Sequence, residues 1–78
     1  MTIAIARTLD VKGMACPIPI VKTAQAMKLL AAGDLLEVLA TDPGSVKYFA
    51  AWSKATGNSL VETTQEDGVY RFVLAKKG

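Results

Sequence analysis

The sequence contains no histidine and a single cysteine, Cys16, and these two scarcities limit its chemistry more than any other feature. Without histidine, the chain lacks the side chain that most often serves as a general base or metal ligand near neutral pH. One cysteine cannot form a disulfide within the chain, a Cys-x-x-Cys redox pair or a multi-thiolate zinc site. We therefore expect no metal and no bound cofactor, and any chemistry at Cys16 must depend on that one thiol.

Long apolar runs are also missing from the sequence. No segment approaches the roughly 20 apolar residues that a helix needs to span a bilayer. Residues 1–7 lack the basic stretch followed by a long apolar stretch that is typical of a signal peptide. A small chain without disulfides or an export signal is expected in the cytoplasm, where thiols stay reduced, and no membrane partner is expected.

Charge of one sign is not concentrated anywhere in the chain. Nine basic and seven acidic residues give a net charge of +2 and are spread along the sequence. A nucleic-acid-binding domain usually shows a clustered basic patch, so no direct nucleic-acid partner is expected. The basic pair Lys76-Lys77 near the C-terminus is interpreted as a solvated tail.

The composition suits one compact domain over residues 1–78, with 51% hydrophobic and 21% charged residues. Apolar alternation over residues 3–11 predicts a strand, and helical spacing over residues 17–32 predicts a helix that Gly33-Asp34 would end. The apolar run 35–40 predicts a second strand. Strand, helix and strand in this order favour a parallel crossover.

The second half repeats the pattern with a helix and a hairpin. Asp42 is the expected N-cap and Pro43 the expected first residue of a second helix, which Gly57-Asn58 would end. Residues 59–65 and 69–75 are expected strands joined through Asp67-Gly68, a strong hairpin signal. The order β-α-β-α-β-β predicts an α/β (α+β) two-layer sandwich, with two helices on one face of a four-stranded mixed sheet.

The apolar spacing also assigns faces to these elements. The first helix is expected to face the core with Ile20, Ala24, Met27 and Ala31, and solvent with Ile18, Lys22, Gln25 and Leu29. The second is expected to face the core with Val46, Phe49, Ala50 and Ser53. Tyr70, Phe72 and Leu74 should line the core side of the last strand, and the open face of the sheet should carry Glu37, Thr63 and Arg71.

Cys16 lies in the segment Gly13-Met14-Ala15-Cys16-Pro17-Ile18-Pro19, where the first strand pattern gives way to a helix pattern. Proline is favoured at the first helical position, which makes Cys16 the expected N-cap and Pro17 the first residue. Pro19 still falls in the turn whose N–H groups have no intrahelical acceptor. A helix N-terminus favours a thiolate, and Lys12 and Lys22 add nearby positive charge. The alternative is a buried, inert cysteine.

The segment from Leu9 to Pro19, with Lys22 beyond it, resembles the signature of the TusA/SirA family of small sulfur-carrier proteins. Gly33-Asp34, Thr41-Asp42-Pro43, Trp52 and the terminal hairpin agree with this resemblance. It implies a sulfur-relay carrier that holds sulfane sulfur as a persulfide on Cys16. The donor would be a cysteine desulfurase or rhodanese-type enzyme, and a downstream protein would be the acceptor. Such a chain is a carrier with sulfurtransferase-type activity rather than a turnover enzyme.

The resemblance also implies roles by position. Cys16 would be the sulfur acceptor, with Pro17 and Pro19 shaping the helix start. Asp10 and Gly13 would set the loop that leads into the site, and Ile18 and Lys22 would contact partner proteins.

The pathway stays open among transfer-RNA 2-thiolation, cytoplasmic sulfur oxidation and molybdenum-cofactor supply. The residue between the two prolines is often polar or acidic in relatives linked to transfer-RNA thiolation, and here it is Ile18. The chain is expected to be a monomer. The alternative function is a small RNA-binding or regulatory interaction module without thiol chemistry.

Overall fold

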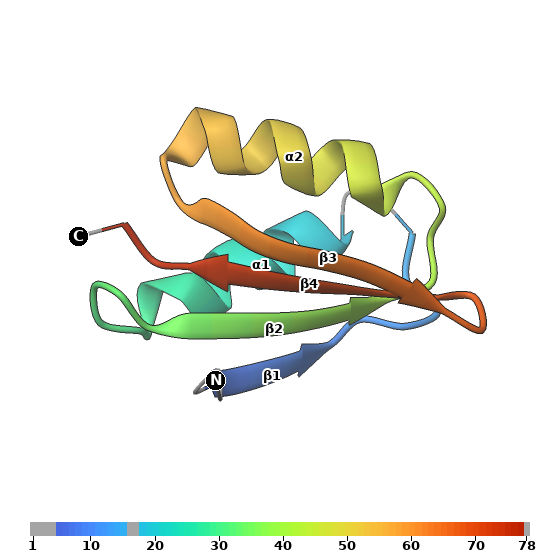
Figure 1. The fold of residues 1–78 in the computed structure, drawn as a ribbon, viewed down its shortest axis with the longest axis horizontal. Helices are drawn as coiled ribbons and strands as arrows, with labels where there is room; N and C mark the ends of the chain where they lie inside the picture. Colours follow the sequence, from blue (N-terminus) through green and yellow to red (C-terminus); the bar gives the residue numbers. More distant parts are fainter. Residues whose placement is uncertain (1–4, 16–17, 78) are drawn as a thin grey trace.

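The structure is a computed structural model that describes residues 5–15 and 18–77 (Figure 1). Cys16 and Pro17 therefore lie outside the described residues. The elements follow the order β1 (Ile5–Asp10), α1 (Ile18–Lys28), β2 (Leu35–Ala40), α2 (Ser45–Thr56), β3 (Ser59–Glu66) and β4 (Val69–Ala75). The predicted β-α-β-α-β-β order is confirmed. None of the helices in these two ranges is long and apolar enough to cross a bilayer.

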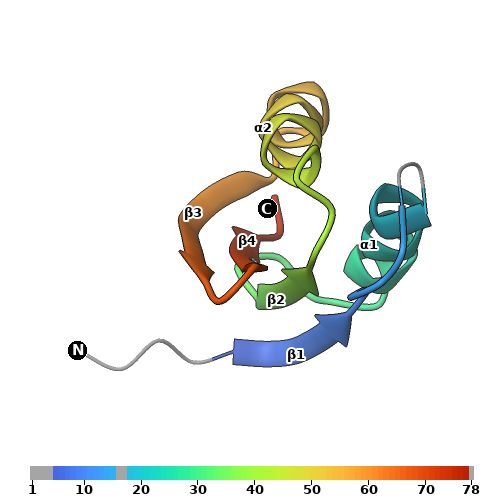
Figure 2. The same ribbon diagram turned by 90° about the vertical axis from the view of Figure 1, so that its right-hand side faces the viewer.

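The four strands form one mixed sheet in the order β1-β2-β4-β3. β1 pairs in parallel with β2, and β4 pairs antiparallel with both of its neighbours. Both helices pack on the same face of this sheet, and the other face is left without a helix (Figure 2). The predicted two-layer arrangement is therefore confirmed, and the face without helices is called the open face below.

The core lies between the helices and the two central strands. Leu36 and Val38 of β2 and Phe72 and Leu74 of β4 have no solvent exposure. Phe49 of α2 is also fully buried, and its ring lies 4.5 Å from that of Phe72, centroid to centroid. Phe72 and Leu74 lie in the core as predicted for the last strand, but burial does not alternate there, because Val73 between them also has no exposure.

The first helix ends earlier than predicted, at Lys28 rather than near residue 32. Leu29 and Leu30 donate to the carbonyls of Ala26 and Met27, three residues back, which tightens the last turn into a 3₁₀-like form. The Lys76 ammonium donates to the Leu30 carbonyl at 2.5 Å. Contacts from the C-terminal segment thus help to end α1.

The early end of α1 also changes its buried face. Ala31, expected in the core, is exposed, whereas Thr23 and Ala26 are buried beside Met27. The expected exposure of Ile18, Lys22, Gln25 and Leu29 is confirmed.

The second helix begins at Ser45 with Gly44 as its N-cap, so the assignment of Asp42 and Pro43 as N-cap and first residue is wrong. Asp42 still shapes the turn that leads into α2. Its carboxylate accepts a hydrogen bond from the Gly44 N–H at 3.1 Å, and its carbonyl accepts one from the Ser45 N–H at 2.9 Å. The later start turns Ser45 inward. Val46, expected in the core, is 40% exposed.

A β-bulge in β3 reverses the expected direction of its later side chains. The register with β4 shifts between Leu60 and Glu62. After this shift Thr63 pairs with Phe72 and Glu62 with Val73. Residues directly opposite each other in a sheet share a face, so Thr63 lies on the helix-covered side. Its placement on the open face was wrong, and Glu62 and Thr64 hold that position.

The C-terminal basic pair is bound to the fold rather than free as a tail. The Lys76 N–H donates to the Asp34 carbonyl, and the Lys76 carbonyl accepts from the Gly33 N–H, both at 2.9 Å. The Lys77 N–H donates to the side-chain oxygen of Asn58 at 2.8 Å. The interpretation of Lys76-Lys77 as a solvated tail is therefore wrong, because backbone hydrogen bonds hold both residues against the ends of the helices.

Candidate functional site

The loop that leads from β1 towards α1 is held at several points. The Asp10 carboxylate accepts from the Lys12 N–H at 3.0 Å and lies 3.8 Å from the Lys12 ammonium. Gly13 has φ +80°, in the left-handed region that glycine adopts without strain. Its N–H donates to the Thr41 hydroxyl at 2.8 Å, which ties the loop to the connection between β2 and α2. Asp10 and Gly13 thus shape this loop.

The two sides of the cysteine-proline pair are joined by a backbone hydrogen bond. The Ile18 N–H donates to the Ala15 carbonyl at 3.0 Å, and the Met14 N–H donates to the Val11 carbonyl at 3.2 Å. Cys16 and Pro17 fall between Ala15 and Ile18 in sequence and lie outside the described residues. The predictions of Cys16 as N-cap and Pro17 as first helical residue therefore stay predictions.

Pro19 and Thr23 form the buried side of the first turns of α1. Both residues are buried, and the Thr23 hydroxyl donates to the Pro19 carbonyl at 2.7 Å. The first turn of α1 contains no acidic residue. Its N-terminal N–H groups therefore present the positive end of the helix dipole without a neighbouring carboxylate from the same turn.

The outer side of the first two turns of α1 is apolar with one cation. Ile18 and Val21 are 45% and 46% exposed, and Lys22 is exposed beside them. We call Ile18, Val21 and Lys22 the docking face. Its exposed apolar surface lies at the same end of α1 as the cysteine segment in sequence, and side chains three and four residues apart are neighbours on a helix.

Two residues of this region, Val21 and Thr41, were not predicted from the sequence. Val21 could have been found, because it follows Ile18 by one helical turn. Thr41 carried no local signal, because its role depends on the loop of Gly13 packing against it.

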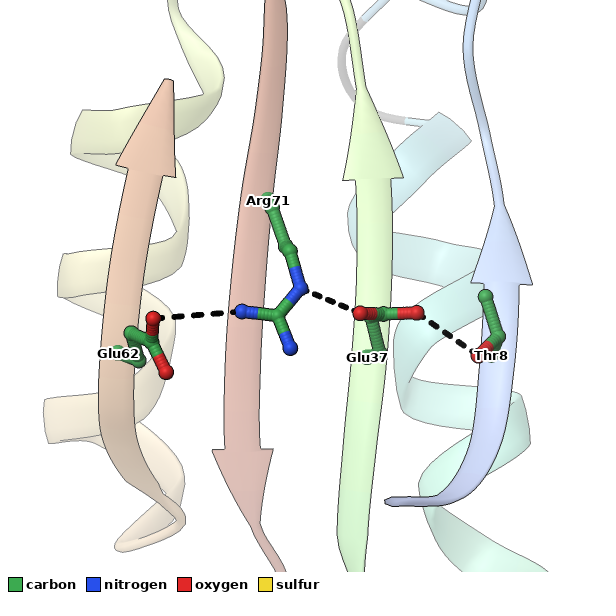
Figure 3. A network of polar contacts seen from close by, with 4 residues as sticks. All are labelled: Thr8, Glu37, Glu62 and Arg71. Atoms are coloured by element: carbon green, nitrogen blue, oxygen red, sulfur yellow. Dashed lines mark hydrogen bonds and ion pairs between the residues drawn. The ribbon is translucent and has the colours of Figure 1, made fainter. Parts of the chain in front are cut away.

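A polar network lies on the open face of the sheet (Figure 3). The Arg71 guanidinium binds Glu37 through Nε and lies 3.4 Å from a carboxylate oxygen of Glu62. The Thr8 hydroxyl donates to the other oxygen of Glu37 at 2.9 Å. Val73 pairs with Glu37 on one side and Glu62 on the other and has no exposure. Two carboxylates of the network therefore flank Val73, a buried apolar residue on the face that no helix covers.

The network should make the stability of the fold dependent on pH. The Arg71 hydrogen bond, and then that from Thr8, lower the pKa of Glu37 below its usual value. Because the folded pKa is depressed, the stabilisation is complete above the unfolded pKa and is lost as pH falls through the folded one. Glu37→Gln should cost about 1 kcal/mol at neutral pH. It should also flatten the loss of stability between about pH 6 and about pH 3 in urea unfolding.

The exposed carboxyl of Glu66, at the end of β3, provides the matched control. Glu66→Gln should leave both the neutral stability and its fall towards acid close to those of the wild type. An equal flattening by both variants would show that net charge, rather than the Glu37 contacts, sets the pH dependence.

Within the described ranges, no three Asp, Glu, His or Cys side chains lie close enough together to hold a metal ion. These ranges exclude Cys16, so the expectation that the chain holds no metal stays a prediction.

A family model described as Sulfurtransferase TusA matches residues 7–76. The chain belongs to the TusA family. The match covers the loop, both helices and β2 to β4, and so extends well beyond the cysteine motif.

Individual relatives agree with membership of the TusA family. The chain is 44% identical over 68 residues to the sulfur carrier protein TusA of Allochromatium vinosum, covering 87% of this chain and 90% of that protein. It is 47% identical over 70 residues to a putative sulfur carrier protein of Bacillus subtilis, covering 90% and 93%. The crystal structure of a SirA-like protein from Desulfitobacterium hafniense superposes with a TM-score of 0.81 at 26% identity, covering 92% of this chain and 99% of that one. The resemblance to the TusA/SirA family is confirmed.

Proposed function

We propose that this chain is a sulfur carrier that accepts sulfane sulfur as a persulfide on Cys16 and passes it to an acceptor protein. The observation that carries the proposal is membership of the TusA family, whose matched relatives are named sulfur carrier proteins. The sequence supports it, because Cys16 is the only cysteine and lies in the family-like Cys-Pro-x-Pro segment.

The transfer balances without a separate oxidant or reductant. The Cys16 thiolate attacks the terminal sulfur of a donor persulfide, the new sulfur–sulfur bond forms, and the donor thiolate leaves. In the second step an acceptor thiolate attacks the terminal sulfur on Cys16, and the Cys16 thiolate leaves. Each step needs an ionised thiol rather than a histidine base, which agrees with a chain that has no histidine.

In this proposal, the positive N-terminus of α1 activates the thiol and the docking face binds the partner proteins. The helix N-terminus, free of acidic side chains in its first turn, favours the thiolate at Cys16. Ile18 and Lys22, with Val21, would contact a desulfurase or rhodanese-type donor and the acceptor. Transfer-RNA thiolation, sulfur oxidation and molybdenum-cofactor supply differ in the acceptor, so the docking face is the surface that would select among them.

The open face of the sheet weighs against the RNA-binding alternative. Single-stranded RNA binding needs aromatic side chains for stacking and a positive surface for the phosphates. Phe72 lies on the opposite, helix-covered side, and the open face presents Glu37 and Glu62 around a single arginine.

Mass spectrometry of the intact chain and of its proteolytic peptides tests the proposed function. After incubation with a cysteine desulfurase and cysteine, or a rhodanese and thiosulfate, the wild-type chain should gain the mass of one or more sulfur atoms on the peptide that contains Cys16. A reducing agent should remove the gain. A chain that gains no sulfur from either donor, or an equal gain on Cys16→Ser, would contradict the proposal.

A further inference from the structure

We propose that a groove between the C-terminal halves of α1 and α2 binds a small organic anion, an apolar body that carries a carboxylate or phosphate head. The groove has a volume of about 290 Å³, close to the lower end of the range for small-molecule sites, about 300–1,000 Å³. In Figure 1 the two helices end on the same side of the molecule, next to the C-terminal segment. We call it the helix groove.

The inner surface of the helix groove is apolar and contains an aromatic ring. Ala24 and Met27 of α1 and Trp52 of α2 line it. Met27 is 4% exposed, and Trp52 is half-buried against the core. The half-buried Trp52 ring, with the small exposed part of Met27, makes this lining apolar and polarisable, which suits an alkyl or aryl body better than a fully polar ligand.

The charge around the helix groove is of one sign. Lys28, Lys76 and Lys77 line it, and none of the described residues that line it is acidic. The Lys76 ammonium is already bound to the Leu30 carbonyl at the end of α1. Lys28 and Lys77 are left to hold a head group, and two ammonium groups beside an apolar floor complement an anion.

The position of Lys77 is set by the fold. The buried side chain of Asn58 accepts from the Lys77 N–H at 2.8 Å and donates to the Thr56 hydroxyl at 3.0 Å. Gly57, between them, ends α2 with φ +81°. A Cβ on Gly57 would lie 2.8 Å from Cδ of Lys77, so the Lys77 stem passes directly over the end of α2. The hydrogen bond to Asn58 holds the backbone of Lys77 beside the helix groove, which Lys77 lines.

The helix groove is separate from the proposed sulfur site. An α-helix rises 1.5 Å per residue, so Lys28 lies about 15 Å along the axis from Ile18. Ligand binding there should therefore leave the N-terminus of α1 and the docking face accessible. The inference does not depend on persulfide chemistry, and Cys16→Ser should bind the anion as the wild type does.

Fluorescence of Trp52, the only tryptophan of the chain, can test the inference. The full chain is titrated with octanoate, with octyl phosphate and with uncharged octanol. Both anions should cause saturable changes, and octanol should bind about tenfold more weakly because it lacks the charge that the lysines meet. The double variant Lys28→Gln/Lys77→Gln should lose about that factor for the anions and keep its octanol affinity.

Lys54→Gln is the matched control, because Lys54 is exposed in the last turn of α2 and does not line the helix groove. It should bind the anions as the wild type does. The proposal is overturned if neither anion gives saturation, if octanol binds as tightly as they do, or if Lys54→Gln weakens binding as much as the double variant. Tighter, lysine-dependent binding of an Asp- and Glu-rich peptide with one leucine would replace the small anion with a protein segment.

Discussion

Excess Cys16→Ser protein is expected to inhibit sulfur transfer by the wild-type chain while carrying no sulfur itself. A serine hydroxyl is not ionised near neutral pH and cannot hold a persulfide, so transfer by the variant should fall at least about a hundredfold, to the rate without carrier. The docking face of Ile18, Val21 and Lys22 is unchanged, so the variant should still occupy the donor. A reconstituted relay with radiolabelled sulfur, read on the acceptor protein, measures both effects.

Two further variants separate docking from chemistry in that relay. Ile18→Asp, added to Cys16→Ser, puts a charge into the exposed apolar part of the docking face and should abolish the inhibition. Val61→Asp in the same background is the matched control, because Val61 is 52% exposed on β3, away from α1. Inhibition that survives Ile18→Asp, or is lost equally with Val61→Asp, would contradict the assignment of the docking face.

Phe72→Ala is expected to remove most of the stability of the fold. Phe72 has no exposure and stacks at a tilt of 31° on the equally buried Phe49. Truncating a buried phenylalanine costs about 3–5 kcal/mol, whereas a chain of this size has in total about 4–12 kcal/mol. Urea unfolding followed by circular dichroism should show a large shift of the midpoint to lower urea concentration.

Phe72→Leu keeps most of the side-chain volume and should lose roughly half as much stability as Phe72→Ala. Val61→Ala, at an exposed site, should change the free energy of unfolding by less than about 0.5 kcal/mol. If Phe72→Ala unfolded at the same urea concentration as Phe72→Leu, the core would be more adaptable than its close Phe49–Phe72 contact indicates.

Local sequence signals were sufficient where a backbone constraint decided the structure. The Asp67-Gly68 pair predicts a tight hairpin, and both residues have positive φ, 51° and 78°, as such a turn requires. Gly57 likewise ends α2 in the left-handed conformation. Period-two alternation placed Phe72 and Leu74 in the core, because β4 is regular throughout its pairing with β2.

Three of the wrong predictions concern places where distant segments decide the outcome. The sequence predicts four further helical residues in α1, but the Lys76 ammonium binds the Leu30 carbonyl, and the Gly33 N–H binds the Lys76 carbonyl instead of continuing the helix. The bulge after Leu60 reverses Thr63, and no residue near it signals an extra residue in the strand. Binding of Lys77 to Asn58 joins residues 19 apart, which local patterns cannot reveal.

The candidate site divides in the same way. The cysteine, both prolines and the exposed Ile18 and Lys22 follow from the motif and from helical spacing. The tie between Gly13 and Thr41 depends on the packing of two connections that are far apart in sequence. Residues with long-range partners are therefore the part of the site for which the structure was needed.

The pH dependence of alkylation at Cys16 shows whether the fold stabilises its thiolate, because the chain has no other thiol to react. The rate of reaction with iodoacetamide is measured against pH for the folded chain and for the same chain in urea. We expect a folded midpoint below the ordinary thiol value of about 8.5, and a return to that value on unfolding. A folded midpoint equal to or above the unfolded one would contradict a thiolate stabilised at the start of α1.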